Sequence, residues 1–272
     1  MRLLQRLALV VLSGAASVWT GATATAQQPE LIVRTSRLYP GQTSFLYVPS
    51  TYDGSRPYRL LVSVHGSNRT AAAYARRFAA FGEANDTIVL APLFPDGTDY
   101  QRLGLQNGER VDLRLLDLID EVAADYRVER EQFDLFGFSG GGQFAHRFLY
   151  LHPERLRSVV VAAPGTVTIP SETTRWPAGF GDVPRLATFD PAALSGTRVM
   201  LLVGADDVDL TGLNQRPIAN LAGGTRLDRV RTLHEAWQTA GIVHTYFEVP
   251  GLGHTLDDRV LAPARSFFAA SR

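Results

Sequence analysis

The stretch FDLFGFSGGGQFAHRFLYL, residues 133–151, decides the fold. It opens as an apolar strand, reaches Ser139, passes three consecutive glycines and ends as a helix. A strand that turns directly into a helix through G-x-S-x-G needs very small residues two positions before and after the serine, here Gly137 and Gly141, because the strand and the helix approach closely. Such a turn exposes the hydroxyl, so we predict that Ser139 is a nucleophile; a purely structural glycine turn is the alternative.

Predicted strands and helices alternate on both sides of this turn. Apolar runs and period-two patterns predict strands over 43–48, 58–65, 87–91, 133–138, 158–163, 198–203 and 245–249. Period-3.6 patterns predict helices over 70–84, 111–126, 141–151, 227–239 and 258–270. This alternation predicts an α/β protein with a mostly parallel central sheet and helices on both faces. The first two strands, separated by a turn signal, are expected to form an antiparallel N-terminal edge.

One segment, 165–194, interrupts this alternation. It is rich in proline and glycine and contains Trp176 and Phe180. Long irregular inserts in compact domains are often functional, and parallel sheets bind ligands beyond the carboxyl ends of their strands. We therefore predict that Trp176 and Phe180 line a substrate pocket. The alternative is that both only pack the insert against the rest of the domain.

The composition excludes several kinds of site. The 272 residues include 27 basic and 27 acidic side chains, 45% hydrophobic residues and no cysteine, and every basic residue is arginine. A chain this apolar with zero net charge is not disordered, and it lacks the basic surplus of a nucleic-acid binder. Without cysteine and lysine it has no disulfide, thiolate nucleophile, cysteine-based metal site or Schiff-base lysine. Hydroxyl nucleophiles and carboxylates remain.

The N-terminus predicts a targeting segment. Two arginines precede the apolar run 7–19, and the small residues 24–26 follow it. This pattern is typical of a secretory signal peptide over 1–26, which leaves 27–272 as a single exported domain, periplasmic or extracellular. The apolar run is short for a membrane-spanning helix, so no stable membrane insertion is expected. A retained N-terminal anchor is the alternative.

A serine hydroxyl needs a base to remove its proton. His254 lies in a glycine-rich loop, 250–255, directly after the strand 245–249, and we predict that it is this base. His65 ends an earlier strand and is expected to serve another role. The remaining histidines are expected on the surface or packed in the core; they are His146, His152, His234 and His244.

The base in turn needs a carboxylate that orients its ring. The segment 203–209, after the strand 198–203, carries three acids close together. Like charges crowded in this way are costly unless they are used or solvated. We predict Asp207 as the orienting acid, with Asp209 as the second choice and Asp206 as the third.

A developing oxyanion needs hydrogen-bond donors. One is expected to be the backbone N–H of Gly140, directly after the nucleophile, and the other an N–H in the loop after the strand 58–65. We assign the second donor to Ser67, with Gly66 as the less favoured choice. A plain turn at this loop is the alternative.

With these motifs the chain resembles the α/β-hydrolase superfamily, and within it the secreted esterase branch that includes polyhydroxybutyrate-depolymerase-like and feruloyl-esterase-like proteins. The residues that carry the resemblance are VHGSNR (64–69), APLFP (91–95), GFSGGGQF (137–144), GADDVD (204–209) and PGLGH (250–254). The order Ser139, Asp207, His254 is the chain order of this superfamily. The resemblance implies an α/β-hydrolase fold and hydrolysis of carboxylic esters through an acyl-serine intermediate, without a metal or cofactor.

The chain departs from the branch at one informative position. Ser67 stands where polymer depolymerases often carry a cysteine, and no separate polymer-binding module follows. Both features favour a plain carboxylesterase; a polyester (polyhydroxyalkanoate-type) depolymerase and a feruloyl or acetyl esterase are the alternatives. An exported, non-catalytic binding protein with a relic site is the alternative of another class. The sequence indicates neither the natural ester, small or polymeric, nor the oligomeric state.

Overall fold

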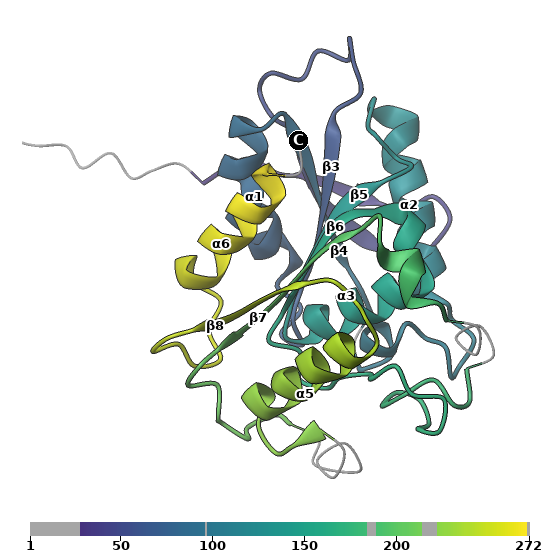
Figure 1. Cartoon of the computed structure of the whole chain (residues 1–272). Helices are drawn as coiled ribbons and strands as arrows, with labels where there is room; N and C mark the ends of the chain where they lie inside the picture. The colour runs from purple at the N-terminus through teal and green to yellow at the C-terminus, as the bar shows by residue number, and fades with distance from the viewer. Residues whose placement is uncertain (1–27, 96, 184–188, 214–221, 271–272) are drawn as a thin grey trace, which may run out of the picture.

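The computed structural model describes residues 28–95, 97–183, 189–213 and 222–270 (Figure 1). The predicted signal peptide, 1–26, lies outside these residues. Within them, no helix has the length and apolar character that a membrane crossing requires.

A single sheet occupies the centre of the described chain. Its strands are β1 (Ile32–Thr35), β2 (Thr43–Tyr47), β3 (Arg59–Val64), β4 (Thr87–Leu93), β5 (Phe133–Phe138), β6 (Leu156–Ala162), β7 (Arg198–Gly204) and β8 (Thr245–Val249). Their order across the sheet is β1-β2-β4-β3-β5-β6-β7-β8. β2 is antiparallel to both its neighbours, and every other pair is parallel. The predicted mostly parallel sheet with an antiparallel N-terminal edge is confirmed.

The pairing within that edge differs from the prediction. β2 pairs with β1 and β4, not with β3, which lies inside the sheet between β4 and β5. Almost every residue of β3 is buried, whereas β2 alternates buried and half-buried residues. A run that is apolar on both faces belongs inside a sheet, and an alternating run belongs near its edge. β1 was not predicted, because its residues are mostly exposed and show no clear alternation.

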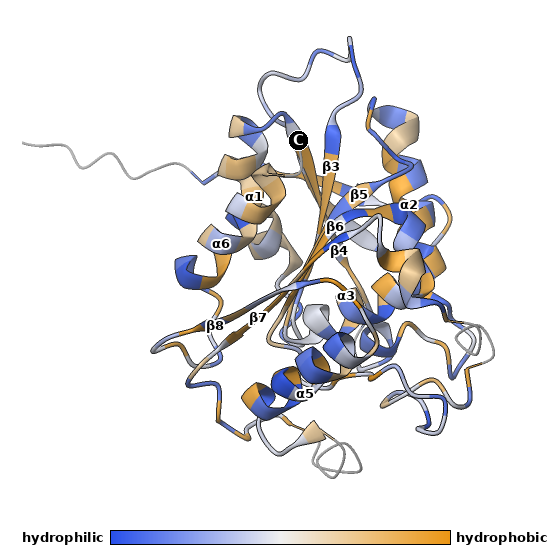
Figure 2. Cartoon of the chain, in the orientation of Figure 1, coloured by the Kyte–Doolittle hydropathy of each residue, from blue (hydrophilic) through white to orange (hydrophobic). Residues whose placement is uncertain are grey.

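Helices cover both faces of the sheet (Figure 1). One side carries α1 (Ala71–Ala84) and α6 (Asp258–Ala269); the other carries α2 (Val111–Asp125), α3 (Gly140–Leu151) and α5 (Arg226–Thr239). Short 3₁₀ turns occur at η1 (Tyr100–Arg102), η2 (Pro153–Arg155) and η4 (Pro191–Leu194). Hydrophobic residues concentrate in the central strands, whereas α5 is largely hydrophilic, as Figure 2 shows. The ends of the predicted elements fall within two residues of the observed ones.

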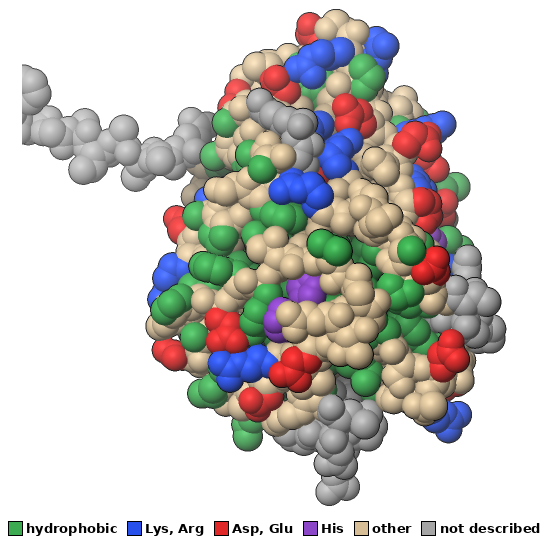
Figure 3. Space-filling view, in the orientation of Figure 1, with side chains coloured by type: hydrophobic (Ala, Val, Ile, Leu, Met, Phe, Trp, Pro, Cys, Tyr) green, Lys and Arg blue, Asp and Glu red, His purple; other side chains and the backbone are tan. Residues whose placement is uncertain are grey.

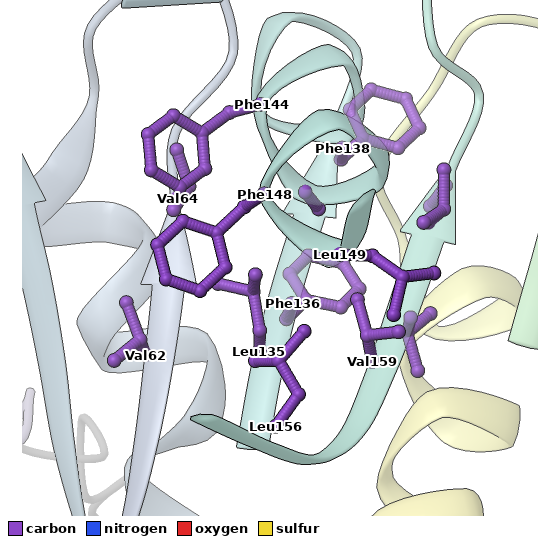
Figure 4. Packing of buried hydrophobic residues seen from close by; sticks show 14 of the residues in the cluster. Val62, Val64, Leu135, Phe136, Phe138, Phe144, Phe148, Leu149, Leu156 and Val159 are labelled. Atoms are coloured by element: carbon purple, nitrogen blue, oxygen red, sulfur yellow. The ribbon is translucent and has the colours of Figure 1, made fainter. Parts of the chain in front are cut away.

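Aromatic side chains fix the helices on both faces of the sheet. Phe78 of α1 packs against Phe136 of β5, with the ring centroids 4.8 Å apart. On the opposite face, Phe144 and Phe148 of α3 lie one turn apart with their rings stacked at 5.7 Å. Figure 4 shows both rings pointing towards the side chains of β3 and β5. Because this packing holds α3 firmly, the turn that precedes the helix has a fixed position on the sheet.

Candidate active site

Ser139 occupies the sharp turn between β5 and α3. Its backbone has φ 57° and ψ −115°, a conformation that costs a non-glycine residue of order 1–3 kcal/mol. The Ser139 N–H donates to the carbonyl of Ala162 at 2.9 Å, and the Ser139 carbonyl accepts from the N–H of Gln143 at 3.0 Å. These two hydrogen bonds hold the strained residue between β6 and the first turn of α3.

The glycines on either side of Ser139 have a steric cause. A Cβ atom on Gly137 would overlap the carbonyl oxygen of Gly141. A Cβ atom on Gly141 would in turn overlap the carbonyl oxygen of Val64 on the neighbouring strand β3. Neither obstacle can move, because both are backbone atoms. The G-x-S-x-G spacing is therefore a requirement of the turn itself.

Two residues from other strand ends complete a hydrogen-bonded series with Ser139. His254, in the loop after β8, places its Nε2 3.0 Å from Ser139 Oγ. Its Nδ1 lies 2.7 Å from Oδ2 of Asp207, in the loop after β7. A carboxylate only accepts hydrogen bonds, so the proton belongs on Nδ1 and leaves Nε2 as an acceptor for the serine hydroxyl. The structure thus brings together the three residues predicted as nucleophile, base and acid.

Burial differs along this series. The Asp207 side chain is 0% exposed and the His254 side chain 22% exposed. The imidazole lies against the ring of Phe138, with centroids 4.9 Å apart and planes 23° apart. The ring is therefore held on one side by an aromatic face and on one edge by a buried carboxylate, while part of it stays accessible.

Arg226, the first residue of α5, is the nearest cation to the buried acid. Its Nη1 lies 3.5 Å from Asp207 Oδ1, an oxygen that accepts no hydrogen bond within the described part of the chain. The same guanidinium donates to the carbonyls of Asp209 and Thr211 at 3.1 and 3.0 Å. Arg226 therefore provides a countercharge for Asp207 and also fixes the loop that carries it.

The other two acids of this loop point elsewhere. Asp206 and Asp209 are both exposed. Asp209 Oδ1 accepts from the N–H and the hydroxyl of Thr211 at 2.9 and 2.8 Å, and these bonds lower the pKa of Asp209. Only Asp207 reaches His254, so the geometry favours the first choice over the second and third.

The predicted oxyanion donors lie beside each other. A Cβ atom on Gly140 would lie 3.1 Å from the backbone nitrogen of Ser67. Neither N–H makes a hydrogen bond to another group in the described ranges. The N–H of Gly66, the less favoured donor, instead donates to the hydroxyl of Tyr74 at 3.1 Å. Gln101 Nε2 donates to Ser67 Oγ at 3.0 Å and so fixes the loop.

His65 has a structural environment. It is fully buried, its Nδ1 lies 2.7 Å from the carbonyl of Gly66, and its Nε2 accepts the N–H of Phe94 at 3.1 Å. Burial lowers the pKa of His65, so the ring is neutral and shapes the loop that carries Ser67.

The other four histidines are also engaged away from Ser139. His146 is buried inside α3, and His152 pairs with Asp112 at 2.8 Å. His234 and His244 lie 2.8 Å from each other across α5 and the chain before β8.

A cavity of about 550 Å³ opens beside Ser139. Its wall presents polar and apolar surface in about equal amounts, and most of its residues were not predicted from the sequence. The neutral polar residues include Ser67, Gln101, Gln143 and Thr166. One of them carried a readable signal: Gln143 lies in the first turn of α3, which follows Ser139 directly. The others come from loops and from η1, whose positions depend on contacts far along the chain.

Trp176 and Phe180 do not line this cavity. Both are buried, with 5% and 3% of their surfaces exposed. The Trp176 ring covers the guanidinium of Arg147 at 5.5 Å, and Phe180 packs against Tyr150 at 5.1 Å. The part of the insert around Trp176 and Phe180 thus packs against α3, whereas its first residues, Gly165 and Thr166, line the cavity. This corrects the pocket prediction and agrees with its packing alternative.

The described residues contain no group of three or more histidine, aspartate or glutamate side chains arranged to hold a metal ion.

Proteins similar to this chain are found among solved structures. No family model and no curated protein matches the sequence. The chain is similar to the solved structure of a poly(3-hydroxybutyrate) depolymerase from Bordetella parapertussis, with a TM-score of 0.70 and 27% identity over 85% of this chain and 84% of that one.

Two further solved structures are similar to the chain. Poly(aspartic acid) hydrolase-1 from Sphingomonas sp. KT-1 has a TM-score of 0.72 and 22% identity over 87% and 97% of the two chains. A ferulic acid esterase has a TM-score of 0.57 and 16% identity over 89% and 94%. The predicted α/β-hydrolase fold is confirmed, and so is the predicted resemblance to this branch.

Proposed function

We propose that this α/β-hydrolase is an exported serine hydrolase that cleaves carboxylic esters through an acyl-serine intermediate. The observation that carries the proposal is the series Ser139 Oγ–His254–Asp207, with distances of 3.0 and 2.7 Å, at the wall of a cavity. A hydroxyl aligned on an imidazole that is itself aligned on a buried carboxylate is the arrangement that activates a serine. The 27% identity to a poly(3-hydroxybutyrate) depolymerase supports an ester as the substrate.

In the first half-reaction, His254 Nε2 removes the proton of Ser139 as Oγ attacks the ester carbonyl carbon. Asp207 holds the ring in the required tautomer and stabilises the imidazolium. The oxyanion accepts hydrogen bonds from the N–H groups of Gly140 and Ser67, each worth about 3 kcal/mol in the transition state. His254 then protonates the leaving alcohol oxygen, and the acyl group remains on Ser139.

The second half-reaction repeats these roles with water as the nucleophile. His254 takes a proton from the water, which attacks the acyl-serine carbonyl, and the same two amides hold the new oxyanion. The imidazolium then returns a proton to Ser139 Oγ, and the carboxylic acid leaves. Every proton is accounted for by His254, so the cycle needs no metal or cofactor.

A small soluble ester is the favoured substrate. A cavity of about 550 Å³ is within the usual size range for small-molecule sites. The depolymerase and ferulic acid esterase neighbours keep the polyester and feruloyl or acetyl ester alternatives open. We also propose that residues 1–26 are a signal peptide and that residues 27–272 form one hydrolase domain.

A panel of esters tests the proposed function. The chain without residues 1–26 is assayed on short-acyl 4-nitrophenyl esters, a feruloyl ester, an acetylated sugar and a polyester film, with Ser139→Ala as the blank. We expect soluble short-acyl esters to be hydrolysed fastest and the blank to be inactive. A folded protein that hydrolyses none of them and is not labelled by a fluorophosphonate would instead be a binding protein with a relic site.

A further inference from the structure

We infer that the cavity beside Ser139 recognises an ester that carries a carboxylate, and that Arg102 and Arg77 bind this negative charge. The inference rests on the proposed function, because it specifies the substrate class of the same site. Its basis is an imbalance of charge in the cavity wall. Among the residues that the structure describes, the wall includes Arg77, Arg102 and Arg226 and no aspartate or glutamate.

This imbalance is local. The whole chain has equal numbers of acidic and basic side chains, and acidic and basic groups are interspersed on the face that Figure 3 shows. A single-sign lining in a concave site concentrates ions of the opposite sign. The cavity is therefore built to attract an anion even though the protein as a whole is neutral.

Two of the three arginines have no carboxylate partner at ion-pair distance in the described ranges. Arg226 is paired with Asp207 at 3.5 Å, but no such pair involves Arg102 or Arg77. Arginines elsewhere in the described chain mostly have an acidic partner; these are Arg34, Arg37, Arg56, Arg59, Arg110, Arg130, Arg157, Arg175, Arg231, Arg259 and Arg265.

The positions of the two unpaired arginines suit substrate binding. Arg102 is half-buried at the end of η1, next to Gln101, the residue that holds Ser67. Arg77 is exposed on α1, the helix that follows the loop carrying Ser67. The two guanidinium groups therefore come from separate elements and border the same cavity.

A buried cation behind the wall strengthens the positive potential. Arg147 is fully buried, and its guanidinium donates only to neutral acceptors, including the Gln101 carbonyl at 2.6 Å and the Thr166 hydroxyl at 2.9 Å. Burial, and next the charge of Arg102, lower the pKa of Arg147 to about 9, so it is still protonated at neutral pH. Gln101 and Thr166 line the cavity, so this charge lies directly behind its surface.

These charges favour a carboxylate as the bound group. Cations held together without a countercharge are unfavourable in a low-dielectric site, and an entering anion removes part of that cost. The planar fork of arginine matches the two oxygens of a carboxylate. A half-ester of a dicarboxylic acid, or an ester of a hydroxy acid, presents such a group a few atoms from its scissile bond.

Matched esters test the inference. Monoethyl glutarate is compared with ethyl glutaramate, and acetoxyacetate with acetoxyacetamide; in each pair a carboxylate is replaced by a carboxamide of the same shape. Turnover is followed by titration of the released acid. We expect kcat/KM to favour the carboxylate in at least one pair by about tenfold or more at low salt. The preference should shrink at about 1 M salt, because the charges border solvent.

Variants assign the preference to residues. Arg102→Gln should raise KM more for the carboxylate than for the carboxamide, so that the ratio of kcat/KM falls towards one. Arg77→Gln should lower the ratio less, because Arg77 is more exposed. The matched control is Arg130→Gln, which removes an exposed arginine that does not line the cavity and should leave the ratio unchanged.

The outcomes separate this inference from the proposed function. Equal kcat/KM within both pairs, with the carboxamides hydrolysed, overturns the anion site and leaves an esterase. A carboxylate preference that persists in the Arg102→Gln, Arg77→Gln double variant overturns the assignment to these residues. No hydrolysis of any ester by folded protein overturns both proposals. The salt dependence is measured on the unsubstituted protein, so it tests the anion site even if Arg102→Gln does not fold.

Discussion

A histidine bonded to a buried aspartate lies near each end of α3, and the two pairs differ in their surroundings. At the first end, His254 Nδ1 lies 2.7 Å from Asp207. At the last, His152 Nε2 lies 2.8 Å from Asp112. Both aspartate side chains are 0% exposed. The helix between them spans roughly 18 Å, so the two pairs are separate.

The difference lies in the remaining hydrogen-bonding capacity. Asp112 is bound a second time by Arg110, at 2.9 Å between Nε and Oδ1, and the His152 ring packs on Phe148 at 4.8 Å. At the other end, Asp207 Oδ1 accepts no hydrogen bond within the described residues, and the free edge of His254 faces Ser139 at a cavity. The Asp112–His152 pair has its hydrogen bonds satisfied and stabilises the fold. The Asp207–His254 pair still faces a hydroxyl group at a cavity, so its imidazole can act as a base.

The largest expected effect on kcat comes from removing the hydroxyl of Ser139, directly before α3. Ser139→Ala leaves His254 and Asp207 in place but removes the atom that attacks the ester. We expect kcat on a 4-nitrophenyl ester to fall by about 10⁶-fold. Circular dichroism and thermal unfolding serve as controls for folding. Activity near that of the unsubstituted protein would show that the hydroxyl is not the nucleophile.

The next largest effect separates the acids of one loop. Asp207→Asn should leave His254 in the wrong tautomer and lower kcat by about 10⁴-fold. Asp209→Asn, the matched control, should change kcat by no more than about twofold, because the Asp209 side chain accepts hydrogen bonds only from Thr211 among the described residues. The reverse ranking of the two variants would assign the acid to Asp209.

At the His152 end of α3, substitution should affect stability and not turnover. Asp112→Asn removes the charge that pairs with Arg110 and His152, while keeping the shape of the side chain. We expect the free energy of unfolding to fall by about 3 kcal/mol, because the fully buried Asp112 loses the charge that binds the half-buried Arg110. The measurement is urea unfolding, with kcat/KM at 25 °C unchanged within about twofold. A large loss of kcat in folded protein would mean that the two ends of α3 are coupled.

The smallest expected effect is the change with pH in the difference in unfolding free energy between the unsubstituted protein and Asp112→Asn. Burial alone would raise the pKa of Asp112, but the hydrogen bonds from His152 and Arg110 lower it to about 2. A lowered carboxyl pKa stabilises the folded state above the unfolded pKa of about 4, and this contribution is lost as the pH falls towards 2. The gap in unfolding free energy between the unsubstituted protein and Asp112→Asn should therefore narrow by about 2 kcal/mol between pH 5 and 2. A constant gap would contradict this account of Asp112.

The strand–helix pattern and the candidate triad were readable from the sequence for local reasons. Ser139 is recognisable by the flanking glycines, at which any side chain would collide with backbone atoms. His254 and Asp207 lie in the loops that follow apolar strands. The pairing of β2 with β4 was not readable, because strand order depends on contacts between distant segments. The two-sided burial of β3 was the only local sign of it.

The cavity wall was the least predictable part of the site. The aromatic residues of the insert, Trp176 and Phe180, attract attention as pocket residues, but aromatic side chains gain most by burial, and here they cover α3. The wall is instead formed by residues from several separate elements, such as Gln101 and Arg102 of η1. Their sequence context resembles any surface loop, and only the fold brings them beside Ser139.

The most direct test of the central claim is the site of covalent labelling by a fluorophosphonate. The folded protein is treated with the probe, and the adduct is counted by intact mass and located by peptide mass spectrometry. The account predicts one adduct per chain, on Ser139, with labelling absent in Ser139→Ala and strongly slowed in His254→Ala, while Asp112→Asn labels at the unsubstituted rate. No adduct on folded protein, or an adduct on another serine, would contradict it.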